Sequence, residues 1–333
     1  GLGCRGDLRP RHQRRPGDRD DHRSTPGIAI VTPPRKVAIL GGGGAMGHGI
    51  ALACLQNSAV EVSIISRRQE TVDHGLSLIV DGRFGLARAV EKGRLSEEQA
   101  ADARSRLSGT TSYEEALEGA DLVFESVPEL VDVKHEVLRN AERMSRDGTV
   151  IATNTSSILI AELAAPLEDP SRLVGTHWFF PANILPLVEV ARSAFVDTEA
   201  LDSVLSYLRA IGKRPVVVKD SPGFFMTRFI NNFLAEAIRL VELGIAGPAE
   251  IDEMVKTGLG WPMGVFELLD ASSFEAFYHA QEYLHETCGE RYAVPPLARQ
   301  AFKAGYLGSA ELKPGSRGGW YDFLGIDRTT EES

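Results

Sequence analysis

Two polar residues within apolar segments could carry out proton transfer. His177 lies in residues 172–180, which we expect to form a strand, and Glu189 interrupts the apolar segment PLVEVA at residues 186–191. A carboxylate inside an apolar strand is costly unless it is paired. Because a short loop joins the two segments, we expect Glu189 to pair with His177. In such a pair a neutral imidazole removes a proton near neutral pH, and the buried carboxylate fixes its tautomer and stabilises the imidazolium that forms.

A glycine-rich turn follows the first apolar strand of the chain. Residues 36–49 read KVAILGGGGAMGHG, with a strand expected at 37–40 and an apolar helix from Ala45. Strand, glycine turn and helix together are the context in which G-x-G-x-x-G binds a dinucleotide. The motif glycines are Gly42, Gly44 and Gly47. The first would permit the tight turn, the second the approach of a pyrophosphate, and the third close packing of the helix on the strand. We expect these glycines and Met46 to bind a cofactor, although a flexible turn is the alternative and Gly41 allows the register to move by one.

The end of the second expected strand bears on the choice of cofactor. Residues 60–65 lead to Ser66, Arg67 and Arg68, where the motif usually has an acidic residue that binds the ribose hydroxyls. A carboxylate here would repel a 2′-phosphate, whereas a guanidinium can pair with one. We therefore expect these three residues at the adenosine ribose, and they favour NADP over NAD. A solvated helix start would also explain them.

Polar residues follow two further expected strands. Glu129 and Lys134 come after residues 121–127, and the polar run from Asn154 to Ser157 directly follows residues 149–153. Open α/β sheets bind ligands at the carboxyl ends of their strands, so both groups could meet a nucleotide or a substrate. Simple capping of a helix is the alternative for the second group.

An unusual pair of helices is expected between the second and third strands. Residues 69–107 read as two amphipathic helices with a break at residues 92–93. Such a pair is not part of a standard dinucleotide-binding fold. Two of its basic residues, Arg88 and Lys92, could bind the phosphates of a bulky substrate, and a solvated helix face is the alternative.

Strands and helices alternate up to residue 219, and only helices are expected afterwards. Capping boxes at residues 96–99 and 112–115 mark two helix starts, and a Pro-Gly boundary at residues 220–223 follows the last strand. We predict four segments: a disordered extension at 1–34, an NAD(P)-binding domain at 35–219, a helical C-terminal domain at 220–325 and a tail at 326–333. A basic arm for a partner and a transit peptide are the alternatives for the first segment.

The composition is that of an acidic globular protein. Its 333 residues are 43% hydrophobic and carry a net charge of −10, although residues 1–34 are basic. The acidic body argues against a nucleic-acid surface, and no apolar run reaches the roughly 18 residues of a membrane span. The three cysteines, Cys4, Cys54 and Cys288, form neither a metal-ligand spacing nor a disulfide framework. We therefore expect a cytoplasmic protein with no metal site.

Taken together, these segments resemble the 3-hydroxyacyl-CoA dehydrogenase family across residues 35–323. The matching pieces, in order, are GGGGAMGHGIA, ESVPELVDVK, ATNTSS, LVGTHWFFP, LVEV, DSPGFF, GWPMGVFELLD and GGWYDF. The resemblance implies an α/β fold: a Rossmann-type, doubly wound, mostly parallel sheet with a helical-hairpin insertion, followed by an all-α C-terminal domain that forms a homodimer. It also implies an oxidoreductase of fatty-acid metabolism that interconverts L-3-hydroxyacyl-CoA and 3-ketoacyl-CoA by hydride transfer with NAD or NADP.

The resemblance also assigns roles to individual residues. It implies that His177 is the catalytic base, that Glu189 orients it, and that Ser156 donates to the reacting oxygen of the substrate. It places Thr227 at a catalytic position where the family has Asn. Residues near the cofactor would be Asn154, Glu129 and Lys134.

Three departures from the family pattern concern substrate and cofactor more than reaction type. Phe180 and Thr227 replace asparagines, and Ser66 replaces the acid at the ribose. One alternative of the same fold is a dehydrogenase of free 3-hydroxy acids, as in lambda-crystallin-like gulonate or carnitine enzymes. Another is a non-catalytic nucleotide-binding homologue, which only the changes at 180 and 227 support.

Overall fold

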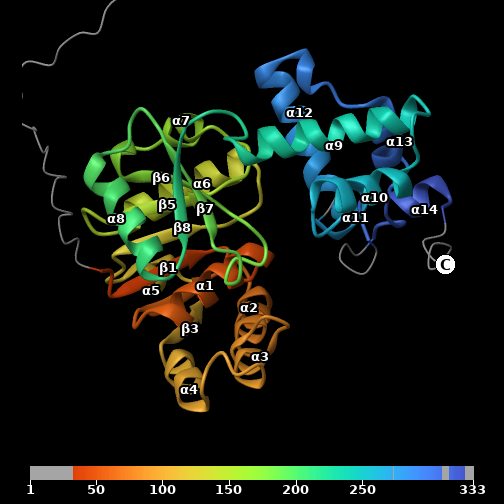
Figure 1. Ribbon diagram of the computed structural model, residues 1–333. Coiled ribbons are helices and arrows are strands. Elements are labelled where there is room, and N and C mark those ends of the chain that lie inside the picture. Colours follow the sequence, from red (N-terminus) through yellow and green to blue (C-terminus); the bar gives the residue numbers. More distant parts are fainter. Residues whose placement is uncertain (1–32, 273, 310–314, 327–333) are drawn as a thin grey trace, which may run out of the picture. The chain divides into compact units, whose positions relative to one another are not determined.

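A computed structural model describes residues 33–272, 274–309 and 315–326 (Figure 1). These residues fall within one compact unit that starts at Pro33. The predicted extension at 1–34, except for its last two residues, and the predicted tail at 326–333, except for Ile326, lie outside the described residues.

An eight-stranded sheet organises residues 36–219 in the order β3-β2-β1-β4-β5-β6-β7-β8. Its strands are β1 Lys36–Leu40, β2 Glu61–Ile65, β3 Leu107–Thr110, β4 Leu122–Glu125, β5 Val150–Asn154, β6 Leu173–Trp178, β7 Leu187–Arg192 and β8 Arg214–Lys219. Neighbouring strands are parallel except for β6 and β7, so the last two strands run opposite to the rest. The prediction of a mostly parallel α/β sheet is confirmed.

Helices cover both faces of this sheet (Figure 1). They are α1 Ala45–Asn57, α2 Gln69–Asp81, α3 Leu86–Glu91, α4 Glu97–Ser105, α5 Tyr113–Leu117, α6 Val131–Met144, α7 Ile160–Ala164 and α8 Thr198–Ala210, with a 3-10 turn at Pro170–Arg172. Alternate residues of β1 enter different cores, because successive side chains of a strand point to opposite faces. Val37 and Ile39 pack with α1 and α8, whereas Ala38 and Leu40 pack with α5, α6 and α7.

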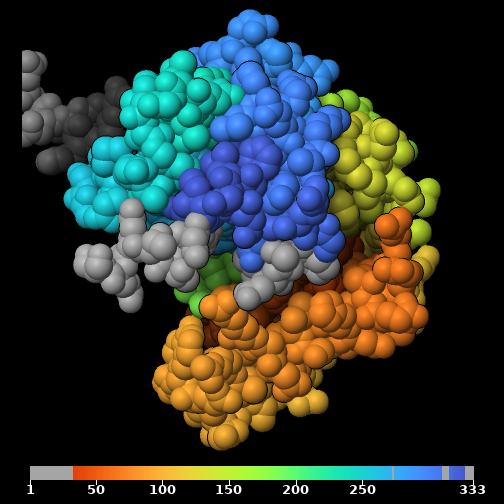
Figure 2. Space-filling view, turned by 90° about the vertical axis from the view of Figure 1, so that its right-hand side faces the viewer, coloured from red at the N-terminus to blue at the C-terminus, as the bar shows by residue number. Residues whose placement is uncertain are grey.

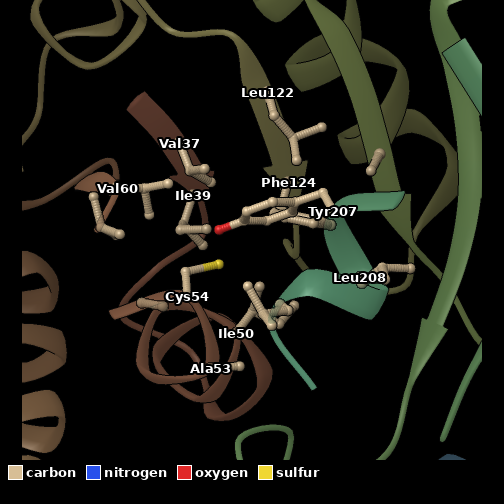
Figure 3. Close-up of a cluster of buried hydrophobic side chains, with 14 of the residues drawn as sticks. Val37, Ile39, Ile50, Ala53, Cys54, Val60, Leu122, Phe124, Tyr207 and Leu208 are labelled. Carbon is tan, nitrogen blue, oxygen red and sulfur yellow. The ribbon is translucent and has the colours of Figure 1, made fainter. Parts of the chain in front are cut away.

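The core between α1 and α8 is apolar around one thiol and one phenol (Figure 3). Phe124 of β4 packs beside Tyr207, with ring centroids 6.5 Å apart. Burial raises the pKa of the Cys54 thiol to about 12, so this cysteine is an inert core residue. This packing holds α1, and with it the glycine turn, against the sheet.

The insertion differs from its predicted form. The first of the two expected helices is split into α2 and α3 by a turn at residues 82–85. A side chain on Gly85 would lie 2.9 Å from the carbonyl oxygens of Ile79 and Val80, so the chain turns back closely on the end of α2. Helices α2 to α4 form a lobe at the surface, drawn in orange in Figure 2.

Two further local predictions need correction. Strand β3 was not expected, because this edge strand has the polar sequence LSGT and only one neighbour, β2. The capping box at 96–99 is confirmed. At 112–115 only one bond of the box forms, from the Glu115 N–H to the Ser112 hydroxyl. The Glu115 carboxylate accepts from the Thr110 hydroxyl instead, and the Ser112 N–H donates to that same hydroxyl.

Residues after the sheet form helices around a third core. They are α9 Met226–Glu242, α10 Pro248–Leu259, α11 Val265–Ser272, α12 Phe274–Cys288, α13 Pro296–Lys303 and α14 Trp320–Leu324, with a 3-10 turn at Glu290–Tyr292. Asp220 ties the connection to the start of α7, because its carboxylate accepts from the backbone N–H groups of Ile160 and Ala161. The prediction of an all-helical C-terminal region is confirmed.

Candidate active site

His177 and Glu189 face each other across the one antiparallel pair of the sheet. They are direct partners in the register of β6 and β7, and His177 Nδ1 lies 2.7 Å from Glu189 Oε2. Both residues are buried, with exposed fractions of 6% and 2%. The predicted pairing is confirmed, and β6 ends one residue after His177.

The second oxygen of Glu189 holds the start of α9. Its Oε1 accepts from the backbone N–H groups of Phe225, at 3.1 Å, and Met226, at 3.0 Å. This oxygen therefore lies at the positive end of the α9 dipole, with both of its acceptor positions used. An ionised Oε2 can only accept, so the proton of the neutral imidazole is on Nδ1 and Nε2 has a free lone pair.

Apolar rings surround the imidazole. The Phe179 ring centroid lies 4.4 Å and the Phe224 centroid 6.3 Å from that of His177. Among the hydrogen bonds of the described residues, none engages His177 Nε2. The site therefore presents one basic nitrogen next to apolar surface.

One carboxylate organises the polar loop after β5. Glu129 Oε1 accepts from the Ser156 N–H at 2.8 Å, from the Ser157 N–H at 3.1 Å and from the Thr155 hydroxyl. Ser156 is exposed, and its hydroxyl takes part in none of the hydrogen bonds of the described residues. Glu129 thus fixes the backbone of Ser156 and leaves its hydroxyl available.

Lys134 links β4 to β5 below this loop. Its ammonium lies 2.9 Å and 3.0 Å from the two carboxylate oxygens of Glu125 and donates to the carbonyl of Asn154 at 2.7 Å. The side chains of Lys134 and Glu125 have no exposed surface. Asn154 in turn accepts from the Trp178 N–H at 3.1 Å, which connects β5 to β6 beside His177.

The glycine turn has the close approaches of a dinucleotide-binding motif, with one role moved. The left-handed residue is Gly41, with φ of 84°, so the tight turn expected at Gly42 occurs one residue earlier. A side chain on Gly42 would lie 2.4 Å from Cβ of Ile64, and one on Gly47 would lie 2.3 Å from the Gly41 carbonyl oxygen. Both glycines are therefore required for packing of β1, β2 and α1.

The start of α1 has room for a pyrophosphate. Gly44 and Ala45 are exposed and Met46 is partly buried, and a side chain on Gly44 would meet nothing closer than 3.3 Å. The free N–H groups of a helix start bind phosphate well. The turn thus fits a dinucleotide.

The residues expected at the ribose lie beside this turn. The Ser66 hydroxyl accepts from the Gly43 N–H at 3.3 Å, and Arg67 and Arg68 are exposed. Neither guanidinium takes part in an ion pair among the described residues.

The remaining predicted residues lie on two helices. Arg88 and Lys92 are exposed at and just after α3, and Arg88 pairs with Glu91 of the same helix. No interaction between described residues joins them to His177. Thr227 is buried in the first turn of α9, next to Met226.

Comparisons with known proteins agree with this geometry. Residues 36–221 match the family described as 3-hydroxyacyl-CoA dehydrogenase, NAD binding domain, and residues 223–317 match its C-terminal domain. The chain belongs to the 3-hydroxyacyl-CoA dehydrogenase family. Membership confirms the predicted activity: the chain is an oxidoreductase with an NAD-binding domain that interconverts 3-hydroxyacyl-CoA and 3-ketoacyl-CoA in fatty-acid metabolism.

Similar proteins include two bacterial relatives and one solved structure. The probable 3-hydroxybutyryl-CoA dehydrogenase of Bacillus subtilis is 34% identical over 86% of this chain and 97% of its own length. The 3-hydroxybutyryl-CoA dehydrogenase of Clostridioides difficile is 31% identical over 86% of this chain and 99% of its own. The structure of (S)-3-hydroxybutyryl-CoA dehydrogenase from Ralstonia eutropha has a TM-score of 0.78 and 33% identity, covering 83% of this chain and 95% of that one.

Two buried charged residues near this site, Glu125 and Lys213, were not predicted. Glu125 carried the same signal as Glu189, an acid within an apolar strand, and could have been found. Lys213 is buried with its ammonium on the carbonyls of Ala182 and Leu185, and nothing in its local sequence indicates this. Among the described residues, no group of acidic, His and Cys side chains is arranged to hold a metal ion, and no helix is long and apolar enough to cross a membrane.

Proposed function

We propose that His177 is the base that removes the hydroxyl proton of a 3-hydroxyacyl thioester. The buried pair with Glu189 carries this proposal, because it places the proton on Nδ1 and leaves Nε2 as an acceptor. When His177 takes the proton, the Glu189 carboxylate stabilises the imidazolium. A bound nicotinamide supplies the chemistry of accepting the hydride.

Ser156 and Thr227 are proposed to donate to the oxygen that becomes the carbonyl. The Ser156 hydroxyl is exposed on a loop whose backbone Glu129 holds. Thr227 lies one residue after Met226, whose N–H binds Glu189. Donors fixed before the reaction stabilise developing charge most effectively.

Turnover of acetoacetyl-CoA with NADH tests the assignment of the base. Replacing His177 with Ala should lower kcat by at least about 10³-fold, while the thermal unfolding temperature shows that the variant is folded. Substantial turnover by folded H177A would refute the proposal. If the wild-type chain turned over free 3-hydroxy acids but no thioester, the substrate class would be wrong instead.

We also propose the remaining residues of the cofactor site, some of which contact the cofactor while others hold those that do. They involve the helix start and the loops after β4 and β5, namely Gly42, Gly44, Met46, Gly47, Glu129, Lys134 and Asn154. The Lys134 side chain has no exposed surface, so its proposed role is to hold the backbone of Asn154. The proposed role of Glu129 is to hold the backbone of Ser156.

The ribose end is proposed to accept a 2′-phosphate. Ser66 brings no negative charge, and Arg67 and Arg68 are exposed. NADPH should then bind more tightly than NADH in a fluorescence titration, and R67A with R68A should reduce NADPH affinity selectively. Tighter NADH binding that is unaffected by these changes would overturn the preference.

The coenzyme A end of the substrate is proposed to meet the insertion. Lys92 is exposed, whereas the charge of Arg88 is shared with Glu91. Reversing the charge of Lys92 should raise KM for acetoacetyl-CoA without changing kcat. It should leave KM unchanged for a thioester that lacks the nucleotide.

A homodimer through the C-terminal helices and a cytoplasmic location complete the proposal. Large apolar side chains are exposed there: Phe229 54%, Leu243 71%, Ile245 65%, Met254 56% and Leu259 61%. Large apolar side chains exposed on a folded protein are candidates for a protein interface, and L243E with L259E should produce a monomer in sedimentation. Cys54 and Cys288 are free thiols, which suits a reducing compartment.

A further inference from the structure

The loop between β6 and β7, residues 179–186, joins parts of the active site that come from distant segments. It follows the strand of His177 directly. Its Ala182 packs on α1, since a side chain on Gly49 would lie 3.1 Å from Ala182 Cβ. Its Asn183 donates to the carbonyl of Phe84 in the insertion at 3.2 Å. The position of this loop therefore affects the base, the cofactor helix and the insertion together.

Lys213 anchors this loop by hydrogen bonds to its backbone. Its ammonium donates to the carbonyl of Ala182 at 2.6 Å and to that of Leu185 at 3.0 Å, and it lies 5.8 Å from the Trp178 ring centroid. The side chain is buried, and burial lowers its pKa to about 8. No carboxylate pairs with it among the described residues, so its interactions are with the loop backbone. Charge-assisted bonds to two carbonyls make it an anchor for this one segment.

The loop presents a large apolar side chain to solvent. Phe180, three residues after His177, is 55% exposed, and its ring meets Phe84 edge to face at 5.7 Å. Ile184 and Leu185 of the same loop are also exposed. An exposed aromatic corner next to a catalytic strand end provides a surface for an apolar part of a ligand.

We propose that Phe180 binds the apolar part of the acyl thioester and that Lys213 is the positioning residue that holds Phe180 in place. This inference rests on the proposed function. The ligand surface that meets Phe180 is aliphatic, and it belongs to the acyl group or to the thioester arm. Lys213 touches neither substrate nor cofactor and acts through residues 179–186.

A double-mutant cycle tests both parts. In F180A, KM for acetoacetyl-CoA should rise about five- to tenfold with kcat within about twofold, as expected for the loss of roughly half the burial of a Phe side chain. K213M should raise KM to a similar extent at a temperature where it is folded. The KM of the double variant should not exceed that of the single variant with the higher KM, because Lys213 acts through Phe180.

Controls separate this reasoning from simple destabilisation. Phe195, on the loop after β7, is 50% exposed, so F195A removes a matched side chain and should leave KM unchanged. If K213M does not fold, K213Q keeps a shorter donor and takes its place. An unchanged KM in F180A, an equal effect of F195A, or multiplicative losses in the double variant would overturn the proposal.

Substrate variants identify which apolar part is bound. If the acyl group binds, the F180A effect grows by about fourfold per added methylene of acyl chain. If the thioester arm binds, the effect disappears on an N-acetylcysteamine thioester. A wild-type chain that turns over no thioester would refute the proposed function, whereas thioester turnover that is insensitive to residue 180 would refute only this inference.

Discussion

Replacing Glu189 with Gln should disable the proposed base, His177, by changing the tautomer of its imidazole. The amide has one oxygen, and two backbone donors, the N–H groups of Phe225 and Met226, compete for it. With the oxygen towards these donors, the amide NH₂ points at His177 Nδ1, which must then accept. The proton moves to Nε2, and the nitrogen that should remove the substrate proton no longer has a free lone pair.

The expected sizes of the two effects differ. A wrong imidazole tautomer lowers kcat by about 10⁴-fold in a comparable His–carboxylate pair. The two bonds to the start of α9 change from charged to neutral acceptors and lose about 1 kcal/mol each. A loss of about 2 kcal/mol corresponds to a decrease of about 4–8 °C in the unfolding temperature for a domain of this size. E189Q should therefore be folded and nearly inactive.

Steady-state turnover of 3-hydroxybutyryl-CoA and thermal unfolding are the measurements. Asp220→Asn is a matched control, because Asp220 also accepts from two backbone N–H groups, those of Ile160 and Ala161, but contacts no imidazole. D220N should lose at least as much stability, because its amide NH₂ faces one of these two donors, and should retain its kcat. If E189Q keeps more than about a tenth of the wild-type kcat, the tautomer argument is wrong.

Three other predictions test the supporting structure. In G47A the new Cβ would lie 2.3 Å from the Gly41 carbonyl oxygen, so this variant should lose both stability and dinucleotide affinity. G44A should lose affinity alone. The unfolding temperature and a titration with NADH distinguish the two variants. K134M leaves Glu125 buried and unpaired and should destabilise the fold by about 3–5 kcal/mol in denaturant unfolding, with partial recovery on adding E125Q. Burial lowers the pKa of His48, so the unfolded chain binds the proton more readily than the folded chain. Stability should therefore fall as the pH drops below about 7. In H48N the unfolding temperature should decline less steeply with falling pH, and an unchanged slope would contradict this.

Sequence reasoning succeeded where a local pattern has one physical explanation. An acid within an apolar strand needs a partner, and the nearest candidate to Glu189 along the chain, His177, is the partner in the structure. The glycine turn was placed correctly to within one residue, because strand, turn and helix are all local. The left-handed position moved to Gly41, since a run of four glycines leaves the choice to packing against β2 and β4.

The parts that could not be predicted depend on distant segments. The donors to Glu189 are backbone N–H groups 36 and 37 residues away, and backbone groups carry no sequence signal. The burial of Lys213 has no local sequence signal, because the carbonyls that its ammonium binds lie 28 and 31 residues earlier. Strand β3 has too little apolar alternation to separate it from the end of a helix.

The carboxylate shared between His177 and α9 limits how this enzyme can be divided. The part that matches the NAD binding domain ends at residue 221 and so includes the glycine turn, the proposed base His177 and Glu189. The two donors that complete the acid follow that point, at residues 225 and 226. A fragment that ends before residue 225 would retain the glycine turn yet lose both donors to Glu189 Oε1. A chimera of two relatives would depend on the second parent to place its own helix start at the same point. Engineers who exchange modules of this protein should therefore carry the first turn of α9 together with the sheet.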